Sequence, residues 1–512
     1  MGRASLAGKP STPAGIEVLH AWYGRRFNHA FYKNMALVLT FLTYALFHAT
    51  RKPPSVVKSV LKGDKQLLAG ATAKGLLSEA DVVSSYGWAP FNGPSGQSLL
   101  GQVDLAFLAA YAIGMFVAGH IGDRTDLRVF LAGGMVLSGL MTTLFGMAYF
   151  WDVHNMSYFI FIMILGGAFQ STGWPSVVSI MANWFGKGKR GLVMGVWNAH
   201  TSLGNIAGTV IASACLQYGW GYSFVVPGIA MSAMGVAVYL LLVVQPSDVG
   251  LPTAGSYESV KSTDEPQPDD DTSAKPAAAE GESVTFWEAW AIPGVASFAL
   301  CLFFSKLIAY TFLYWLPYYI KSTPIQGQLL SARQAGDLST LFDVGGVAGG
   351  ILAGHLSDKT GASALVATCF TAACVPALWL YRAYGHMTLA TNVALMMACG
   401  FLVNGPYALI TTAVSADLGT HESLNGNAKA LATVTAIIDG MGSIGAAIGP
   451  FLTGYIAEAA GFDGVFGMLY TSAILAGALL VRLVIKELQT LRLVSVKGHM
   501  RVPSGVQLTA KA

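Results

Sequence analysis

Residues 118–125 read AGHIGDRT, and residues 353–360 read AGHLSDKT. Each stretch follows a long apolar segment, and a glycine precedes each at the same offset, Gly114 in the first and Gly349 in the second. An eight-residue match at equivalent places along the chain indicates duplication of a larger unit rather than a chance likeness of two loops. Duplicated units of several helices are typical of membrane transporters built from two halves.

The composition supports a membrane location for both halves. Of the 512 residues, 54% are hydrophobic and 11% are charged, whereas soluble domains carry roughly 25% charged residues. Apolar stretches of about 20 residues, long enough to cross a hydrocarbon core of ~30 Å, recur along the chain. The net charge of +3 is too small to indicate a nucleic-acid partner. We therefore predict an all-α integral membrane protein whose main surroundings are the lipid bilayer.

The apolar stretches predict twelve transmembrane helices in two pseudo-symmetric bundles of six. The expected helices are 35–57, 101–121, 128–150, 158–182, 190–214, 221–245, 291–320, 337–357, 362–382, 388–415, 430–457 and 465–487. A long connection without helix is expected at 58–100. The proline-rich, acidic stretch 246–286 predicts a disordered linker between the halves. The resulting domains are an N-terminal segment (1–34), a first bundle (35–245), the linker (246–286), a second bundle (287–488) and a tail (489–512).

Basic residues in the short loops predict the orientation. They fall on one face of the predicted fold: Arg25, Arg26, Lys33, Arg124, Arg128, Lys187, Lys189, Arg190, Lys359, Lys486 and Arg492. Because such residues concentrate on the cytoplasmic side, we expect both termini and the linker in the cytoplasm. We expect the endoplasmic reticulum or another internal membrane rather than the plasma membrane. A glycosylation sequon begins at Asn155 on the opposite side, and the sequence leaves its occupancy open.

Longer motifs carry a resemblance to a known family. They read YALFHATRKP (44–53), QSTGWPSVVSIMANWFGKGKRG (170–191), KLIAYTFLYWLP (306–317), GDLSTLFDVGG (336–346), NGPYALITTAVSADLG (404–419) and NAKALATVTAIIDG (427–440). The repeated loops resemble the signature loops of the major facilitator superfamily. The longer motifs resemble the eukaryotic sugar-phosphate exchangers of its organophosphate:phosphate antiporter family, including plant glycerol-3-phosphate transporter-like members, over all twelve helices.

The resemblance implies the major facilitator fold and a function. It implies a secondary active antiporter that exchanges an organic phosphate, such as glycerol 3-phosphate or glucose 6-phosphate, for inorganic phosphate by alternating access. The sequence leaves the organic phosphate open. It predicts no cofactor and no metal, and we expect a functional monomer.

Ionisable residues inside membrane helices are costly, so each needs a partner or a function. The resemblance places Arg51 on the family's phosphate-binding arginine, and a guanidinium donates two parallel hydrogen bonds to phosphate and stays charged. The alternative for Arg51 is an arginine that snorkels to the membrane surface. Lys306 is expected in the middle of the helix 291–320, one turn from Ala309, where bacterial relatives carry an arginine.

These two cations, one from each half, suggest a mechanism for obligatory exchange. Two like charges that face each other across an empty cavity oppose its closure, and a bound phosphate removes that penalty. The carrier would then reorient only when it is loaded.

The resemblance suggests further substrate contacts: His48, Tyr44, Tyr111, Asn198, His200 and Asn404. His200 is displaced by one position from the family's histidine, so a packing role is an equal alternative. His48 lies one turn before Arg51 on the same helix face. The two tyrosines have packing as their alternative.

A second group of residues is expected to gate the carrier or to form ion pairs: Lys52, Asp343, Asp123, Arg124, Asp358, Lys359 and Asp439. Lys52 and Asp343 are expected to pair between the first and eighth helices, because a buried unpaired charge costs several kcal/mol. Asp123 and Asp358, in the repeated loops, are expected to cap a neighbouring helix and to pair with basic residues nearby. Asp439 is expected either to orient a lysine or to bond neighbouring backbone.

Nothing in the sequence predicts an enzyme. There is no Walker loop for ATP and no Cys/His cluster with metal-ligand spacing. All five cysteines fall in predicted helices, which favours packing rather than a disulfide framework. The alternatives are a proton-coupled symporter of another solute, with Asp343 or Asp439 as the proton carrier, and a non-transporting sensor or scaffold with the same fold.

Overall fold

A computed structural model describes residues 12–63, 87–122, 124–185, 197, 199–252, 286–414, 418 and 428–499. Most of the expected linker 246–286 therefore lies outside the described residues. At its start, Pro246–Val249 forms a single short turn of 3-10 helix, η3.

The first half of the chain is helical throughout its described part. Its helices are α1 (Ala14–Tyr23), α2 (His29–Ala49), α3 (Pro53–Lys62), α6 (Gly96–Gly122), α7 (Leu127–Phe150), α8 (Met156–Gln170), α9 (Gly173–Trp184), α11 (His200–Cys215) and α12 (Tyr222–Leu241). A 3-10 turn, η2 (Leu216–Tyr218), follows α11.

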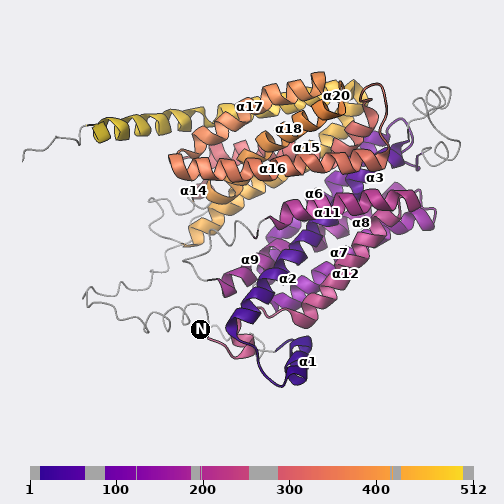
Figure 1. The fold of residues 1–512 in the computed structure, drawn as a ribbon, viewed down its shortest axis with the longest axis vertical. Coiled ribbons are helices and arrows are strands. Elements are labelled where there is room, and N and C mark those ends of the chain that lie inside the picture. Colours follow the sequence, from indigo (N-terminus) through magenta and orange to yellow (C-terminus); the bar gives the residue numbers. More distant parts are fainter. Residues whose placement is uncertain are drawn as a thin grey trace, which may run out of the picture.

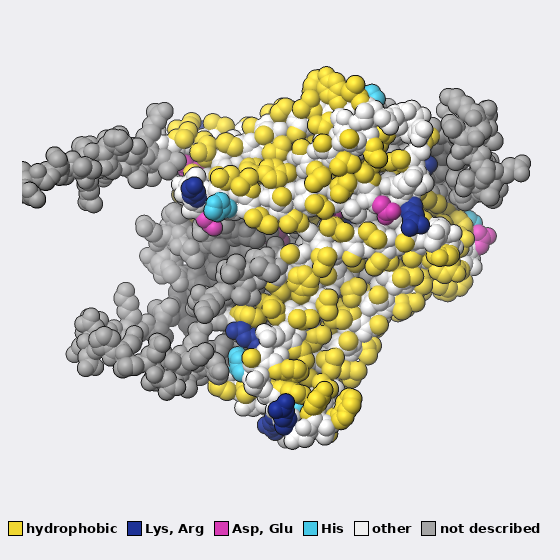
Figure 2. Space-filling view, in the orientation of Figure 1, with side chains coloured by type: hydrophobic (Ala, Val, Ile, Leu, Met, Phe, Trp, Pro, Cys, Tyr) yellow, Lys and Arg dark blue, Asp and Glu magenta, His cyan; other side chains and the backbone are white. Residues whose placement is uncertain are grey.

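The second half is built in the same way. Its helices are α14 (Phe286–Ala291), α15 (Val295–Ser322), α16 (Ala332–Thr360), α17 (Ser363–Tyr384), α18 (Leu389–Leu409) and α20 (Ala428–His499), and a π-helical turn, η4 (Ile410–Val414), extends α18. The prediction of an all-α membrane protein is confirmed. Within the described part, nine helical stretches are long and apolar enough to cross a membrane, and apolar side chains cover the flank between the two ends of the molecule (Figure 2).

The N-terminal segment 1–34, in which no helix was predicted, contains helix. Residues 14–23 form α1, and α2 begins at His29, ahead of the expected start at 35. Ile16 of α1 is fully buried in a core cluster that also contains Tyr32. The sequence pattern missed α1 because the helix is short and exposes much of its surface, including Trp22 and Tyr23.

The first expected helix is broken and longer than predicted. Thr50–Lys52 separate α2 from α3, directly before Pro53 and Pro54. Pro53 and Pro54 have no amide proton to donate to the carbonyls of Ala49 and Thr50, four residues earlier, and their rings crowd those carbonyls, so the break follows from the sequence. Helix then continues to Lys62, past the expected end at 57, because two prolines at the start of a helix lack only amide protons that would be unpaired there anyway.

The last two expected helices form one hairpin with almost no loop. The 72 residues of α20 are helical except at Gly461, whose backbone has φ 65° and ψ −169°. Glycine adopts this left-handed conformation without a Cβ clash. The inner arm of α20 packs against α15 and α6, and the outer arm turns back along α17 (Figure 1).

The two halves meet at one end of the molecule. At the end that holds α1 and α14, here called the terminal end, each half has its own core cluster. At the opposite end, where α3 lies, one cluster is shared: it joins α3, α6, α7 and α8 of the first half to Tyr314, Trp315, Tyr318 and Ala447 of the second. This second end is called the closed end. The halves are therefore joined at the closed end and diverge toward the terminal end (Figure 1).

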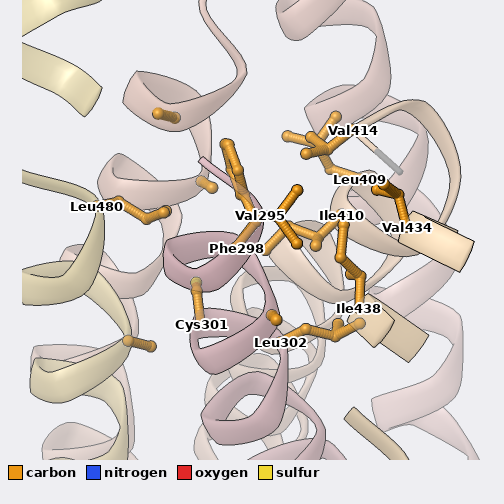
Figure 3. Close-up of a cluster of buried hydrophobic side chains, with 14 of the residues drawn as sticks. Val295, Phe298, Cys301, Leu302, Leu409, Ile410, Val414, Val434, Ile438 and Leu480 are labelled. Atoms are coloured by element: carbon orange, nitrogen blue, oxygen red, sulfur yellow. The ribbon is translucent and has the colours of Figure 1, made fainter. Parts of the chain in front are cut away.

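The core of the second half at the terminal end shows how such a bundle is packed. Side chains from α15, α18 with η4, and α20 interdigitate there (Figure 3), with Phe298, Leu302, Ile410 and Ile438 among them. Cys301 is one of these packing residues and is buried and free of any disulfide.

Candidate functional site

Arg51 lies at the break between α2 and α3 and points into the first bundle. Its residue is only 5% exposed, so the side chain does not snorkel to the surface. Its Nε donates to Gln170 Oε1 of α8, and its guanidinium carbon lies 4.4 Å from the ring centre of Tyr111. Its Nη2 is buried and has no hydrogen-bond partner among the described residues. Arg51 also lines a cavity together with Thr50, Pro54, Phe107 and Tyr314. The Gln170 amide and the Tyr111 ring thus hold the guanidinium in place, while its Nη2 remains available as a hydrogen-bond donor.

Lys306 lies near the middle of α15, as the sequence predicts, and is also 5% exposed. Its Nζ lies 2.6 Å from Asp439 Oδ1 of α20, so Asp439 orients the lysine. Asp439 has 31% of its side chain exposed. Of the two alternatives open for this aspartate, the structure selects the ion pair rather than backbone bonding. A phosphate oxygen that binds Lys306 Nζ would have to displace Asp439 Oδ1 or bind beside it.

Two tyrosines that were not predicted from the sequence lie within electrostatic range of both cations. The Tyr407 ring centre is 5.5 Å from Lys306 Nζ, and Tyr407 is also an electrostatic neighbour of Arg51. Tyr310 is an electrostatic neighbour of both Arg51 and Lys306. Tyr310 could have been predicted from the sequence, because it lies four residues after Lys306 and therefore on the same face of α15. Arg51 and Lys306 therefore border a common region lined by phenol groups.

A polar network joins the two halves beside this region. Lys52 Nζ lies 3.9 Å from Asp343 Oδ2 of α16 and donates to the Leu313 carbonyl oxygen at 3.3 Å. Asn205 of α11 donates to Asp343 Oδ1 at 3.5 Å, and its Oδ1 lies 3.2 Å from His48 Nδ1. His48 is thus engaged with an amide of its own half and linked through it to the second half.

His200 is enclosed by aromatic rings. It is fully buried, with ring centres at 4.3 Å from Trp197, 4.7 Å from Tyr44 and 5.9 Å from Phe41. Its Nδ1 lies 3.2 Å from Thr201 Oγ1. Tyr44 packs within this group and is itself buried. This geometry favours the packing alternative for His200. Tyr44 packs against His200 and is also an electrostatic neighbour of Arg51 and Tyr111, so its predicted substrate contact stays a prediction.

Of the two asparagine candidates, Asn404 is bonded within its own helix. Asn404 donates to the Gly400 carbonyl oxygen of its own helix at 3.0 Å and packs against Gly346 of α16. Asn198 lies outside the described residues, so its predicted contact remains a prediction.

In the repeated loops the expected helix caps are made by other residues. Asp126 accepts from the Arg128 amide at 2.8 Å and caps α7. Glu487 of α20 accepts from the first amides of α17, those of Ala364 and Leu365, at 2.9 and 2.8 Å.

The predicted capping role of Asp358 is therefore wrong for this arrangement, because a carboxylate from another helix occupies the start of α17. Asp358, Lys359 and Arg124 are exposed, and none forms an ion pair with a described residue. Asp123 lies outside the described residues.

A buried ion pair escaped sequence reasoning altogether. Lys58 Nζ of α3 lies 2.8 Å from Asp104 Oδ1 of α6, and the two side chains are 1% and 0% exposed. Lys58 was assigned to a connection without helix because the expected first helix ended at 57. Asp104 falls inside the expected helix 101–121 and, as an acidic residue in an apolar segment, was a signal that could have been used.

The described residues contain no group of three or more His, Cys, Asp or Glu side chains that could hold a metal ion. The polar groups around Arg51 and Lys306 are instead these two cations, their acidic or amide partners, and phenols. Such a set suits an anion with several oxygens, since guanidinium, ammonium and hydroxyl groups all donate to phosphate or carboxylate.

Comparison with known proteins places this arrangement in a family. A family profile described as Major Facilitator Superfamily matches residues 69–424 and 322–499. An Arabidopsis thaliana protein named "Putative glycerol-3-phosphate transporter 1" is 53% identical over 490 residues, covering 93% of this chain and 92% of its own. The Xenopus tropicalis protein named "Glucose-6-phosphate exchanger SLC37A2" is 48% identical over 477 residues, covering 90% of this chain and 94% of its own.

A crystal structure of a bacterial homologue of the human lysosomal transporter Spinster superposes with a TM-score of 0.57, covering 88% of this chain and 96% of the other at 14% identity. At that identity the likeness concerns the fold alone. The curated relatives, in contrast, match the chain almost end to end at about half identity. The chain belongs to the Major Facilitator Superfamily and, within it, to the organophosphate:phosphate antiporter family.

Proposed function

We propose that this protein exchanges an organic phosphate for inorganic phosphate across a membrane by alternating access. The observation that carries the proposal is Arg51, a buried guanidinium whose Nη2 has no partner among the described residues. An unpaired donor on a buried cation is costly, so the site is suited to a bound anion. The names of the relatives, a glycerol-3-phosphate transporter and a glucose-6-phosphate exchanger, support a phosphate ester as that anion.

Lys306 is the second phosphate contact in this proposal. Because its ammonium is paired with Asp439 at 2.6 Å, the site does not present two bare cations. The simple mechanism in which two like charges oppose closure therefore needs revision. Phosphate would be held by Arg51 and would draw Lys306 away from Asp439, and this rearrangement would couple loading to closure. The Tyr310 hydroxyl supplies a further donor to the phosphate or to the organic part, and the Tyr407 ring lies 5.5 Å from Lys306 Nζ and attracts its charge.

Lys52, Asp343, Asn205 and His48 form a link between the halves rather than a substrate contact in this proposal. Their bonds join α3 and α11 of the first half to α16 of the second. A link of this kind has to rearrange when the halves rotate against each other, which fits a gating role.

The test is counterflow in proteoliposomes loaded with inorganic phosphate. Labelled glycerol 3-phosphate, glucose 6-phosphate and inorganic phosphate are offered outside, with and without a proton gradient. We expect uptake that requires internal phosphate and is insensitive to the gradient, and that is lost in Arg51→Ala and Lys306→Ala. Arg382→Ala is the matched control, because this arginine pairs with Asp463 at the protein surface. Parental exchange by both cavity variants would refute the proposal.

The same assay separates the alternatives. A proton-coupled symporter would accumulate solute in response to the gradient without internal phosphate, and a sensor would show no flux with any member of the panel. The panel also identifies the preferred organic phosphate.

The location is part of the proposal. The basic loop residues support a terminal end that faces the cytoplasm, in the endoplasmic reticulum or another internal membrane, with a monomer as the working unit. Protease protection of epitope tags at both ends of the chain in sealed microsomes tests the orientation, and digestion of both tags is expected.

A further inference from the structure

The ion pair between Lys58 and Asp104 is the most deeply buried charge pair among the described residues. Its two side chains are 1% and 0% exposed, and its N–O distance is 2.8 Å. Replacing a buried ion pair by apolar residues of similar volume is often neutral or stabilising, so stability alone does not account for such a pair. The pair is not part of the proposed phosphate site either, so a role other than stability or phosphate binding has to account for it.

Its position along the helices is defined by the neighbouring contacts. The helices α3 and α6 run in opposite directions, since Arg51 lies over Tyr111 and Lys58, seven residues later, meets Asp104, seven residues earlier. Seven residues of helix span about 10 Å. The pair therefore lies about two turns from Arg51, on the side of the closed end.

The second half covers this pair. The ring centres of Trp315 and Tyr314 on α15 lie 5.1 and 5.3 Å from Lys58 Nζ, within the range of cation–π attraction. The Trp315 indole donates to the Pro450 carbonyl oxygen of α20 at 3.0 Å, which fixes the ring to its own half. A charge of the first half is thus held against aromatic rings of the second.

Farther from Arg51, the closed end is sealed by hydrogen bonds between the halves. Gln97 donates to the Tyr318 hydroxyl at 2.8 Å, and Gln102 donates to the Tyr455 hydroxyl at the same distance. The Ser98 amide donates to Glu458 at 3.1 Å. The Lys58–Asp104 pair forms the innermost layer of this seal, the layer nearest to the phosphate site.

Two buried polar atoms without a hydrogen-bond partner in the described part belong to this inner layer and to the ring that covers it: Asp104 Oδ2 and Tyr314 Oη. Buried polar groups are normally paired. Unpaired polar groups between the phosphate site and the closed end are what a passage requires if it is dry in this arrangement and hydrated in another.

We propose that Lys58 and Asp104 form an inner latch that closes this passage and, on opening, lines it. Asp104 holds the Lys58 ammonium against Trp315 and Tyr314 while the closed end is shut. When the halves part there, the pair stays with the first half and the two rings leave with the second. Both residues are positioning residues for transport. The inference rests on the proposed function in one respect, namely that the halves reorient.

The test measures the distance across the closed end in the full-length protein in proteoliposomes. Spin labels are placed at Trp151→Cys and Met387→Cys, two exposed positions, one on each half. Cys215 and Cys369, the native cysteines that are not buried, are replaced by alanine. Double electron–electron resonance then reports the fractions of short and long distances, alongside the rate and KM of phosphate self-exchange.

We expect Lys58→Met and Asp104→Asn to shift the ratio of long to short distances about tenfold toward the open state. Maximal exchange should fall by a similar factor while the KM for phosphate changes little, because Arg51 is untouched. Lys58→Arg, which keeps the charge and can stack on the rings, should restore both readouts. Arg382→Ala should match the parent.

The double variant Lys58→Met/Asp104→Leu covers the case in which a single variant does not fold, because it removes both charges together. It should also populate the open state. A parental distance distribution in this folded variant overturns the latch and leaves the pair a structural one. Failure of the proposed function is seen separately, as absence of phosphate exchange in the parent, since the distance readout needs no substrate.

Discussion

The surroundings of Arg51 and of Lys306 differ, although the two residues occupy related places in the two halves. Arg51 is held by the Gln170 amide and the Tyr111 ring, and its Nη2 has no partner in the part of the chain that the structure describes. Lys306 is held by the carboxylate of Asp439 at 2.6 Å. The first half therefore presents an uncompensated positive charge, whereas the second presents one that is already neutralised.

This difference assigns different tasks to the two halves. A phosphate oxygen can bond to Arg51 without displacing any group, whereas it must compete with a carboxylate for Lys306. The first half is thus suited to capture the anion, and the second responds only once the anion is present. The two cations are not interchangeable, and the following substitutions test that statement in order of expected effect.

The largest effect is expected from Arg51→Lys. The change keeps the charge but removes the planar fork, so two hydrogen bonds become one, and phosphate exchange should fall about 100-fold in kcat/KM. The measurement is the initial rate of labelled phosphate uptake into phosphate-loaded proteoliposomes. Arg382→Lys, at the surface, serves as control and should be unaffected. Activity of Arg51→Lys within twofold of the parent would show that charge alone suffices.

Gln170→Glu should make the first half resemble the second. It places a carboxylate where the Arg51 Nε now donates to an amide, so phosphate would have to compete there as well. We expect the KM for phosphate to rise about tenfold with little loss of maximal rate. Gln170→Leu removes the bond without adding charge and separates the two effects. Equal KM values for the two variants would contradict the competition argument.

Asp439→Asn should make the second half resemble the first. Freed of its carboxylate, Lys306 becomes available to phosphate, and the KM for phosphate should fall about fivefold. The comparison variant is Asp463→Asn, which removes an exposed aspartate of the same half. A rise in KM would show that Asp439 is needed to place the lysine rather than to restrain it.

The smallest effect is expected at Tyr407, whose ring lies 5.5 Å from Lys306 Nζ. Tyr407→Leu removes the ring and should raise the KM for phosphate about threefold, whereas Tyr407→Phe keeps the ring and should stay near the parental value. If the phenylalanine variant is as impaired as the leucine variant, the hydroxyl, and not the ring, is the contact that matters.

The fold could be predicted because its main signals in the sequence are strong and local. Apolar stretches of membrane length and the repeated AGHxxDxT loops predicted helices in two halves, and all twelve expected ranges overlap helices of the structure. Boundaries were weaker where tertiary packing decides them. Ile16 places α1 in the core, and the prolines at 53 and 54 begin a new helix rather than end the old one.

The site was predicted only in part, and the misses share a cause. Arg51, Lys306 and the partners Lys52 and Asp343 could be selected because charges stand out in apolar segments. Contacts between residues on distant helices could not be predicted from the sequence. Nothing in it pairs Glu487 with the start of α17 or Lys58 with Asp104.

The near-absence of a loop at Gly461 has a mechanical consequence. A hairpin that turns over a single residue has no flexible loop between its arms, so the two arms are expected to move together as one rigid unit. The inner arm touches the first half at the closed end through Tyr455 and Glu458, and the outer arm holds the start of α17 through Glu487 at the terminal end. A displacement at the closed end is thereby transmitted to the terminal end along the outer arm of this hairpin, independently of the substrate site.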